Sequence, residues 1–222
     1  ITLPKATILS YDVKIESTLL GDGTYSNPYQ VWTATDFTKA VAKATTYSDR
    51  NIYIKQMADI VVSSDGFNSP KHEPQAFFGH YMGNNKTITL YCGSTAHVVP
   101  RLFNGNYGYI SDLNVEVNYY SSSNHCKIDK SIFCDSNYGV IDSCYVSGLV
   151  GTSGDAFGAF AQINYGKISN CENNLSVYMY NDETGSFKYQ FGGICYRMVE
   201  SQIRPTSSSF TNSSYALVDY PE

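Results

Sequence analysis

The chain has 222 residues and a formal net charge of −5, with 20 Tyr, 11 Phe and 17 Gly. This acidic balance argues against binding to nucleic acid or to anionic membrane surfaces, because both partners need a basic footprint on the protein. No apolar run approaches the length of a membrane span, and the many aromatic and β-branched residues predict an all-β fold.

The N-terminal part of the chain predicts a strand or linker followed by one helix. Residues 1–20 alternate weakly between apolar and polar side chains, and the turn-rich segment GDGTYSNPYQV starts at Gly21. Thr33 is a candidate N-cap with Asp36 three residues later, which predicts a helix over residues 34–47. Its apolar face contains Phe37, Ala40, Val41 and Ala44. We expect this helix to cover one end of a stacked β-structure, where an open sheet edge would promote aggregation.

One short phrase is written three times in the second half of the chain and predicts a β-solenoid. The copies begin with Asn-Tyr-Gly at Asn106, Asn137 and Asn164, and a weaker copy covers residues 196–203. The second copy starts 31 residues after the first (137 − 106), and the third starts 27 residues after the second (164 − 137). Such spacing is typical of solenoids, in which each copy forms one coil that cannot bury its apolar face alone.

Alignment of the copies places equivalent residues in columns that would face a common interior. The columns are Ile110, Ile141 and Ile168 and, three residues later, Leu113, Cys144 and Cys171. The polar residues between them favour a tight turn, and the alternation that follows favours a strand. A recurring aromatic residue upstream of each copy predicts a further inward column of Phe103, Phe133 and Phe160, with Ile194 before the weaker copy. Successive coils should lie about 4.8 Å apart in parallel register.

Several segments, in order, resemble the GLUG-motif repeat proteins of bacterial cell surfaces. The segments are the opening GDGTYSNPYQV, the stretch FFGHYMGNNKTI from Phe77, and the NYG-x-I-x-x-C copies, with the naming phrase surviving as FGAF at Phe157 and FGGI at Phe191. The resemblance covers roughly Gly21 to Ile203. It implies a right-handed parallel β-helix on a secreted or surface-anchored protein, often beside adhesin or pilin-like parts. We expect a β-helix domain over residues 21–205 and a C-terminal tail over residues 206–222.

The cysteines leave two interpretations open. They are Cys92, Cys126, Cys134, Cys144, Cys171 and Cys195. An even number in an extracellular protein favours disulfides. Cys144 and Cys171 share a column on neighbouring coils, so their Cα atoms should lie within the distance range of a disulfide. Parallel side chains, however, hold their sulfur atoms poorly for the required dihedral angle, so a ladder of free thiols is the alternative. Because no Cys-x-x-Cys pair occurs, we expect neither a metal nor a cofactor.

The acidic residues are the candidates for catalysis, because a glycan-cleaving β-helix needs paired carboxylates or an acidic calcium cluster. They are Asp112, Asp135, Asp142, Glu116 and Glu172. Asp112 and Asp142 fall in predicted turns, where turn formation is the simpler role. The four histidines show no i, i+4 pairing, and no P-loop or nucleophile-elbow motif occurs. We therefore do not expect an enzyme.

Tyrosines at outward or strand-end positions are the sequence evidence for binding. They are Tyr119, Tyr120, Tyr145, Tyr178 and Tyr180. Tyrosine offers a large amphipathic contact area and is enriched at recognition surfaces, although stacked rings can also serve to stiffen a coil. The column of Asn106, Asn137 and Asn164 predicts a hydrogen-bonded turn ladder rather than a ligand site.

Together these features predict a non-catalytic extracellular module, bacterial or on a virion surface. It would recognise a carbohydrate or a protein on a host or neighbouring surface, as part of an adhesin, pilus or similar appendage. The alternatives are a structural filament subunit that self-assembles through its terminal segments, and a polysaccharide lyase or hydrolase. Neither a nucleic-acid partner nor insertion of this segment into a membrane is expected.

Overall fold

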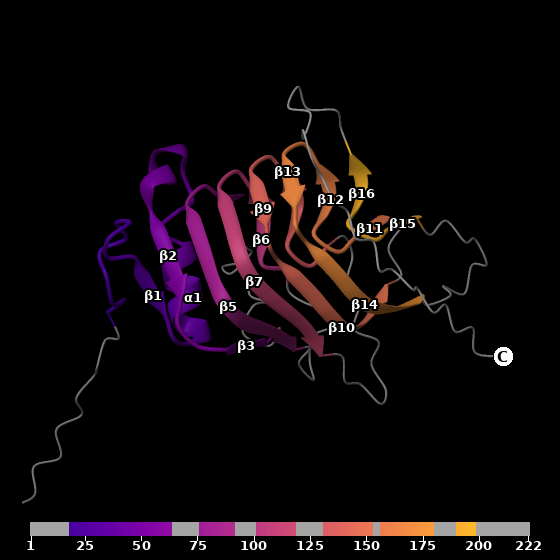
Figure 1. The fold of residues 1–222 in the computed structure, drawn as a ribbon, viewed down its shortest axis with the longest axis horizontal. Helices are drawn as coiled ribbons and strands as arrows, with labels where there is room; N and C mark the ends of the chain where they lie inside the picture. The colour runs from indigo at the N-terminus through magenta and orange to yellow at the C-terminus, as the bar shows by residue number, and fades with distance from the viewer. Residues whose placement is uncertain are drawn as a thin grey trace, which may run out of the picture.

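The computed structural model describes residues 18–63, 76–91, 101–118, 131–152, 156–179 and 190–198. These residues form a β-solenoid in which every described strand pairing is parallel (Figure 1). The predicted all-β solenoid with one α-helix is therefore confirmed. Among the described helices, none has the length and apolarity needed to span a membrane.

The strands in the described ranges belong to three sheets, and neighbours in a sheet come from successive coils. The nine-stranded sheet contains β1 (Tyr29–Val31), β2 (Tyr53–Gln56), β3 (Ile60–Ser63), β5 (His80–Tyr91), β7 (Tyr109–Asn118), β9 (Val140–Asp142), β10 (Tyr145–Thr152), β13 (Lys167–Ser169) and β14 (Glu172–Met179). The five-stranded sheet contains β4 (Ala76–Phe77), β6 (Phe103–Asn106), β8 (Cys134–Asn137), β12 (Ala161–Asn164) and β16 (Cys195–Met198). A two-stranded sheet pairs β11 (Ala156–Gly158) with β15 (Gln190–Gly192).

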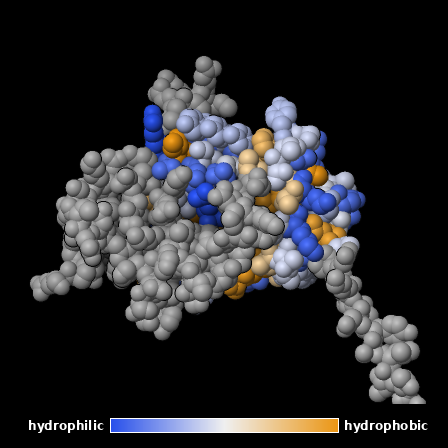
Figure 2. All heavy atoms as spheres, turned by 180° about the vertical axis from the view of Figure 1, so that it is seen from behind, coloured by the Kyte–Doolittle hydropathy of each residue, from blue (hydrophilic) through white to orange (hydrophobic). Residues whose placement is uncertain are grey.

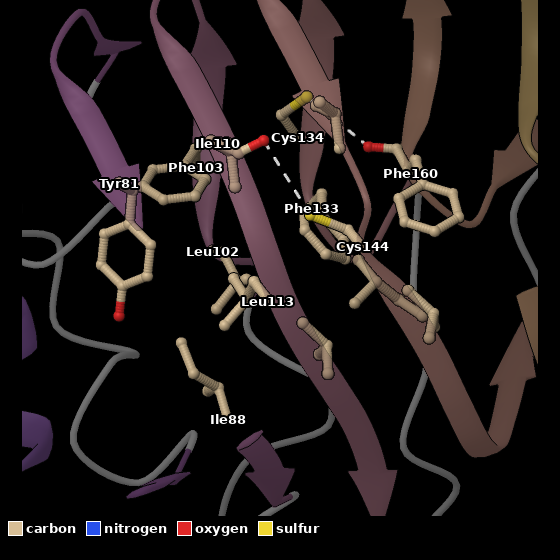
Figure 3. Packing of buried hydrophobic residues seen from close by; sticks show 14 of the residues in the cluster. Tyr81, Ile88, Leu102, Phe103, Ile110, Leu113, Phe133, Cys134, Cys144 and Phe160 are labelled. Carbon is tan, nitrogen blue, oxygen red and sulfur yellow. Dashed lines mark hydrogen bonds between the residues drawn. The ribbon is translucent and has the colours of Figure 1, made fainter. Parts of the chain in front are cut away.

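The core is a continuous stack of buried side chains between the sheets. Ile110 is the register partner of Ile141, and Ile141 is that of Ile168, in the order that the repeat alignment predicts. Tyr81 occupies the same position one coil earlier, and its fully buried hydroxyl donates a hydrogen bond of 2.9 Å to Gln56. Figure 3 shows Ile110 near Cys144, whose side chain belongs to the next coil.

The predicted aromatic column is confirmed for Phe133, Phe160 and Ile194, which stand directly before the register partners Cys134, Ala161 and Cys195. It is wrong in register for Phe103. Phe103 pairs with Cys134, whereas Phe133 lies one residue earlier in its own coil. The reason is a difference of one residue in length, because Phe103 stands three residues before its Asn-Tyr-Gly copy and Phe133 stands four residues before the next. All three rings, Phe103, Phe133 and Phe160, are nevertheless buried, since both positions contact the core (Figure 3).

Helix α1 (Ala34–Val41) lies at the N-terminal end of the solenoid, behind β2 in the view of Figure 1. The predicted capping box is present: the Thr33 hydroxyl accepts a hydrogen bond from the Asp36 amide, and the Asp36 carboxylate accepts one from the Thr33 amide. Phe37 reaches into the core, with its ring centroid 5.7 Å from that of Tyr81. The predicted apolar face is buried in full: Phe37, Ala40, Val41 and Ala44.

The helix ends earlier than the predicted range of 34–47. Its last residue is Val41, and a 3-10 helix, η1 (Tyr47–Asn51), follows. The carbonyl of Ala44 accepts a hydrogen bond of 2.8 Å from the Phe78 amide of the next coil, so this part of the chain already belongs to the solenoid ladder. Thr46 then forms a second capping box with Asp49, which starts η1.

Candidate functional site

Each Asn-Tyr-Gly phrase forms one corner of a coil. Strands β6, β8 and β12 end at the asparagine, and strands β7, β9 and β13 begin directly after the glycine. The three residues of the phrase therefore repeat along the same corner from coil to coil. Each of them has a different environment.

The asparagine points into the core and forms a hydrogen-bonded ladder. Asn106 donates through Nδ2 to Oδ1 of Asn137, and Asn137 donates in the same way to Asn164, both at 2.7 Å. Asn106 also accepts a hydrogen bond of 3.1 Å from the Gly108 amide, which closes the corner turn. The three side chains are buried and satisfied by one another and by the backbone of the turn, which confirms the predicted hydrogen-bonded turn ladder.

The glycine permits close contact between coils. A Cβ atom added to Gly139 would clash with the carbonyl oxygen of Gly108, and one added to Gly166 would clash with that of Gly139. Any larger residue would push the coils apart at this corner. The glycine column thus brings the flanking side chains of successive coils into contact.

The tyrosine points outward, and its repetition produces an aromatic ladder. We use this name for Phe78, Tyr107, Tyr138 and Tyr165. Ring centroids of successive members are 4.7, 4.6 and 4.6 Å apart, and the ring planes differ by 9°, 9° and 2°. Tyr107 and Tyr138 are each 46% exposed, and a Cβ atom at Gly105 would lie 3.3 Å from the Tyr107 ring. The rings therefore lean over the outer face of the five-stranded sheet, with one edge open to solvent.

The aromatic ladder presents hydroxyls beside apolar ring edges. Burial raises the pKa of Tyr138, and the neighbouring Tyr107 and Tyr165 raise it further, so this hydroxyl is protonated at physiological pH. At the N-terminal end, Tyr47 approaches the Phe78 ring edge to face at 6.4 Å, and the Arg50 guanidinium lies 3.5 Å from the Tyr47 ring centroid. The Tyr138 hydroxyl can thus donate and accept hydrogen bonds in its neutral form.

A second row of aromatic side chains follows the other side of the glycine column. It contains Tyr25, Tyr53, His80 and Tyr109. The rings of Tyr53 and His80 are stacked with centroids 4.4 Å apart, and Tyr109 follows 6.0 Å from His80. The Tyr109 hydroxyl lies 3.4 Å from the Asp142 carboxylate, and burial, followed by the charge of Asp142, raises the pKa of Tyr109.

The tyrosines predicted as binding residues are not members of the aromatic ladder. Tyr145 is half-buried on β10, and its hydroxyl accepts a hydrogen bond of 3.1 Å from Asn174. Tyr178 belongs to β14, where only its backbone is described, and Tyr119, Tyr120 and Tyr180 lie outside the described residues. The aromatic ladder was missed, although tyrosine occupies the second position of every Asn-Tyr-Gly copy.

Two of the candidate acids, Asp142 and Asp135, have side-chain partners, and the others are placed by their backbone. The Asp142 carboxylate accepts hydrogen bonds from Ser169 at 2.6 Å and from Asn170 at 3.0 Å, which links two successive turns. Asp135 forms an ion pair of 3.5 Å with Arg101. Asp112 adopts a φ of 52°, a turn conformation that it shares with Ser143 and Asn170 at 53°. Glu116 pairs in register with Ser147, and Glu172 pairs with Tyr145.

Within the described ranges, no group of three or more His, Cys, Asp or Glu side chains is placed to hold a metal ion. The cysteines in these ranges, Cys134, Cys144, Cys171 and Cys195, are free thiols. Cys92 and Cys126 lie outside the described residues.

Seen from behind, the described part of the surface carries hydrophobic residues in small groups among hydrophilic ones (Figure 2).

A scan against protein-family models found no match, and searches of curated proteins and of solved structures gave no significant similarity.

Proposed function

We propose that this chain is a non-catalytic extracellular recognition module that binds a glycan or a partner surface through the aromatic ladder. The observation that carries the proposal is the row of stacked, partly exposed rings of Phe78, Tyr107, Tyr138 and Tyr165. We place the module at a bacterial cell surface or on a virion, as part of an adhesin, pilus or similar appendage. The resemblance to GLUG-motif repeat proteins supports this setting.

Pre-organisation is the physical reason why a stacked ladder suits recognition. A flexible side chain loses rotamer freedom when it is immobilised in an interface, at a cost of about 0.5–1.5 kcal/mol. The ring of Tyr138 is already held between Tyr107 and Tyr165, with centroids 4.6 Å away on both sides. A ligand that contacts the open ring edges and hydroxyls would therefore order little additional protein.

The repetition of the rings is the second reason why the aromatic ladder suits recognition. The rings recur once per coil, so the ladder offers the same amphipathic group at regular intervals along the solenoid. A partner with a repeating structure, such as a polysaccharide, can contact several equivalent groups at once, and each contact adds to the total affinity. Tyrosine hydroxyls are suitable partners for sugar hydroxyls, and the open ring edges add apolar contact area beside them.

The test is a screen of immobilised glycans and host-surface preparations with the purified protein. We expect Tyr107→Ala combined with Tyr138→Ala to weaken the binding found in the screen at least about tenfold, the loss typical of central aromatic contacts. Tyr107→Phe combined with Tyr138→Phe keeps the stacked rings and removes only the hydroxyls. This pair should give an intermediate loss while the thermal unfolding midpoint stays close to that of the original protein.

Tyr145→Ala provides a matched control on the outer face of another sheet. Binding should be unchanged in this variant, because Tyr145 stands apart from the aromatic ladder. Full binding by the Tyr107→Ala, Tyr138→Ala variant would refute the role of the ladder. Loss of binding after replacement of Tyr119 and Tyr120 alone would place the site on those residues instead.

A further inference from the structure

Two cysteines from successive coils meet at one turn of the solenoid. Cys144 and Cys171 each follow a residue with a φ of 53°, Ser143 and Asn170, so both coils have the same local backbone. Their next residues, Tyr145 and Glu172, are register partners, and the Glu172 amide donates a hydrogen bond of 3.0 Å to the Cys144 carbonyl. The two Cα atoms are therefore separated by about one strand spacing, 4.7–4.9 Å, which lies within the range compatible with a disulfide.

The two thiols differ in exposure. Cys144 is 2% exposed, and its Sγ atom lies 3.2 Å from the Asp142 carbonyl oxygen (Figure 3 shows the side chain in the core). Cys171 is partly exposed, and its Sγ atom lies 3.1 Å from the Ser169 carbonyl oxygen and 3.7 Å from that of Ile141. Cys171 is therefore the more accessible thiol of the pair, and Cys144 belongs to the preceding coil.

We propose that Cys171 and Cys144 form a reversible thiol–disulfide exchange site that reacts with small disulfides. The Cys171 thiolate attacks one sulfur of the small disulfide, which forms a mixed disulfide at Cys171 and releases the first thiolate. Cys144 then loses its proton to solvent and attacks the Cys171 sulfur, which forms the Cys144–Cys171 bond and releases the second thiolate. The protein loses two electrons, and the small disulfide gains them as two thiols.

The electrostatics agree with this order of attack. The neighbouring Cys144 side chain, which can donate to the Cys171 thiolate, lowers the pKa of Cys171, whereas burial raises the pKa of Cys144. The thiolate is the reactive form of cysteine, so the partly exposed Cys171 is the attacking group. Cys144 acts only after the mixed disulfide has brought a reactive sulfur beside it.

Strain is the reason why the bond should be reversible. Both sulfur atoms point toward the carbonyls of their own turn and of the preceding coil, and closure requires at least one side chain to rotate away from this position. Bonds that depart from the preferred disulfide geometry are more easily reduced. The closed form would link two neighbouring coils, and mild reductants would reopen it.

The experiment treats the full chain, first reduced, with glutathione disulfide, and then maps the products by mass spectrometry after alkylation of the remaining thiols. The original protein should give a peptide cross-linked between Cys144 and Cys171, which low concentrations of dithiothreitol return to two thiols. Cys144→Ser should stop at the glutathione adduct on Cys171. Cys171→Ser should leave Cys144 unmodified, and Cys134→Ser, a change at a fully buried cysteine of β8, should still form the cross-link.

The test does not depend on the folding of the variants, because mapping the cross-link and the glutathione adducts in the original protein already distinguishes the proposed exchange from the alternatives. A stable glutathione adduct on Cys171 without the cross-link would overturn the proposal. So would a cross-link that resists mild reduction, since that would be a permanent structural disulfide. Modification of Cys144 ahead of Cys171 would refute the assigned order.

Discussion

His80 links the second row of aromatic side chains, Tyr25, Tyr53, His80 and Tyr109, to the pH dependence of the stability of the fold. Its imidazole stacks on the Tyr53 ring at 4.4 Å and faces Tyr109 on the other side at 6.0 Å. Burial disfavours the charged form and lowers the pKa of His80 below 6.5, although a hydrogen bond with the backbone of Arg50 acts in the opposite direction. The folded protein therefore binds a proton less readily at this position than the unfolded chain.

This shift predicts a pH dependence of stability. Between the lowered pKa and the ordinary value of 6.5, the unfolded state carries more protons than the folded state, so the free energy of unfolding falls as pH decreases through this window. His80→Phe retains a stacked ring and removes the titration. We expect urea unfolding to show that the free energy of unfolding falls less between pH 7.5 and pH 5 in the variant than in the original protein. Equal losses in the two proteins would contradict the prediction.

At the scale of the element, the strands β6, β8 and β12 depend on the asparagine ladder at their ends. Asn137 is the central member, because it accepts from Asn106 and donates to Asn164, both at 2.7 Å. These contacts are buried, and a buried polar group that loses its partner is expensive. The ladder thus couples adjacent strands in addition to their backbone hydrogen bonds.

Asn137→Ala should lower the free energy of unfolding by about 2–4 kcal/mol, since it leaves one buried donor and one buried acceptor without their partners. Urea denaturation monitored by circular dichroism measures the loss. Tyr138→Phe is the adjacent control. It retains the stacked ring and should change the stability by less than about 0.5 kcal/mol. A loss of less than about 1 kcal/mol for Asn137→Ala would show that water or backbone groups replace the ladder.

The regular register of the whole solenoid should allow one coil to be removed without disturbing the pairing of the others. Asn137 pairs with Asn164, so removal of residues 137–163 would join Ser136 to Asn164 with all columns retained. Stability in such an array is approximately a sum of terms within coils and between neighbours. A coil can therefore be removed as a unit if the register is kept.

Deletion of residues 137–163 should give a folded protein with a β-type circular dichroism spectrum and a smaller urea m-value, because less surface is exposed on unfolding. Deletion of residues 137–150 is the control. It joins Ser136 to Gly151 and places the following side chains out of register, so cooperative unfolding should be lost. Loss of the folded state in both deletions would contradict the additive description.

The repeat spacing made much of this architecture predictable. The isoleucine column, the capping box at Thr33 and the buried asparagine ladder all follow from local patterns that recur once per coil. The end of α1 could not be predicted from local patterns, because the Ala44 carbonyl accepts a hydrogen bond from the amide of Phe78 in the next coil. The register of Phe103 was also wrong, since one additional residue in the following coil cannot be placed from spacing alone.

The sequence by itself determined that the chain stacks as a parallel solenoid, because each copy repeats a set of apolar residues that only a neighbouring copy can cover. Only the tertiary structure decided which repeated residues reach the surface together. Tyr107, Tyr138 and Tyr165 are far apart along the chain, yet the glycine column brings their coils close enough for the rings to stack. The same stacking brings Cys171 beside Cys144. Such contacts depend on the distance between coils, which is a property of the assembled backbone rather than of any single copy.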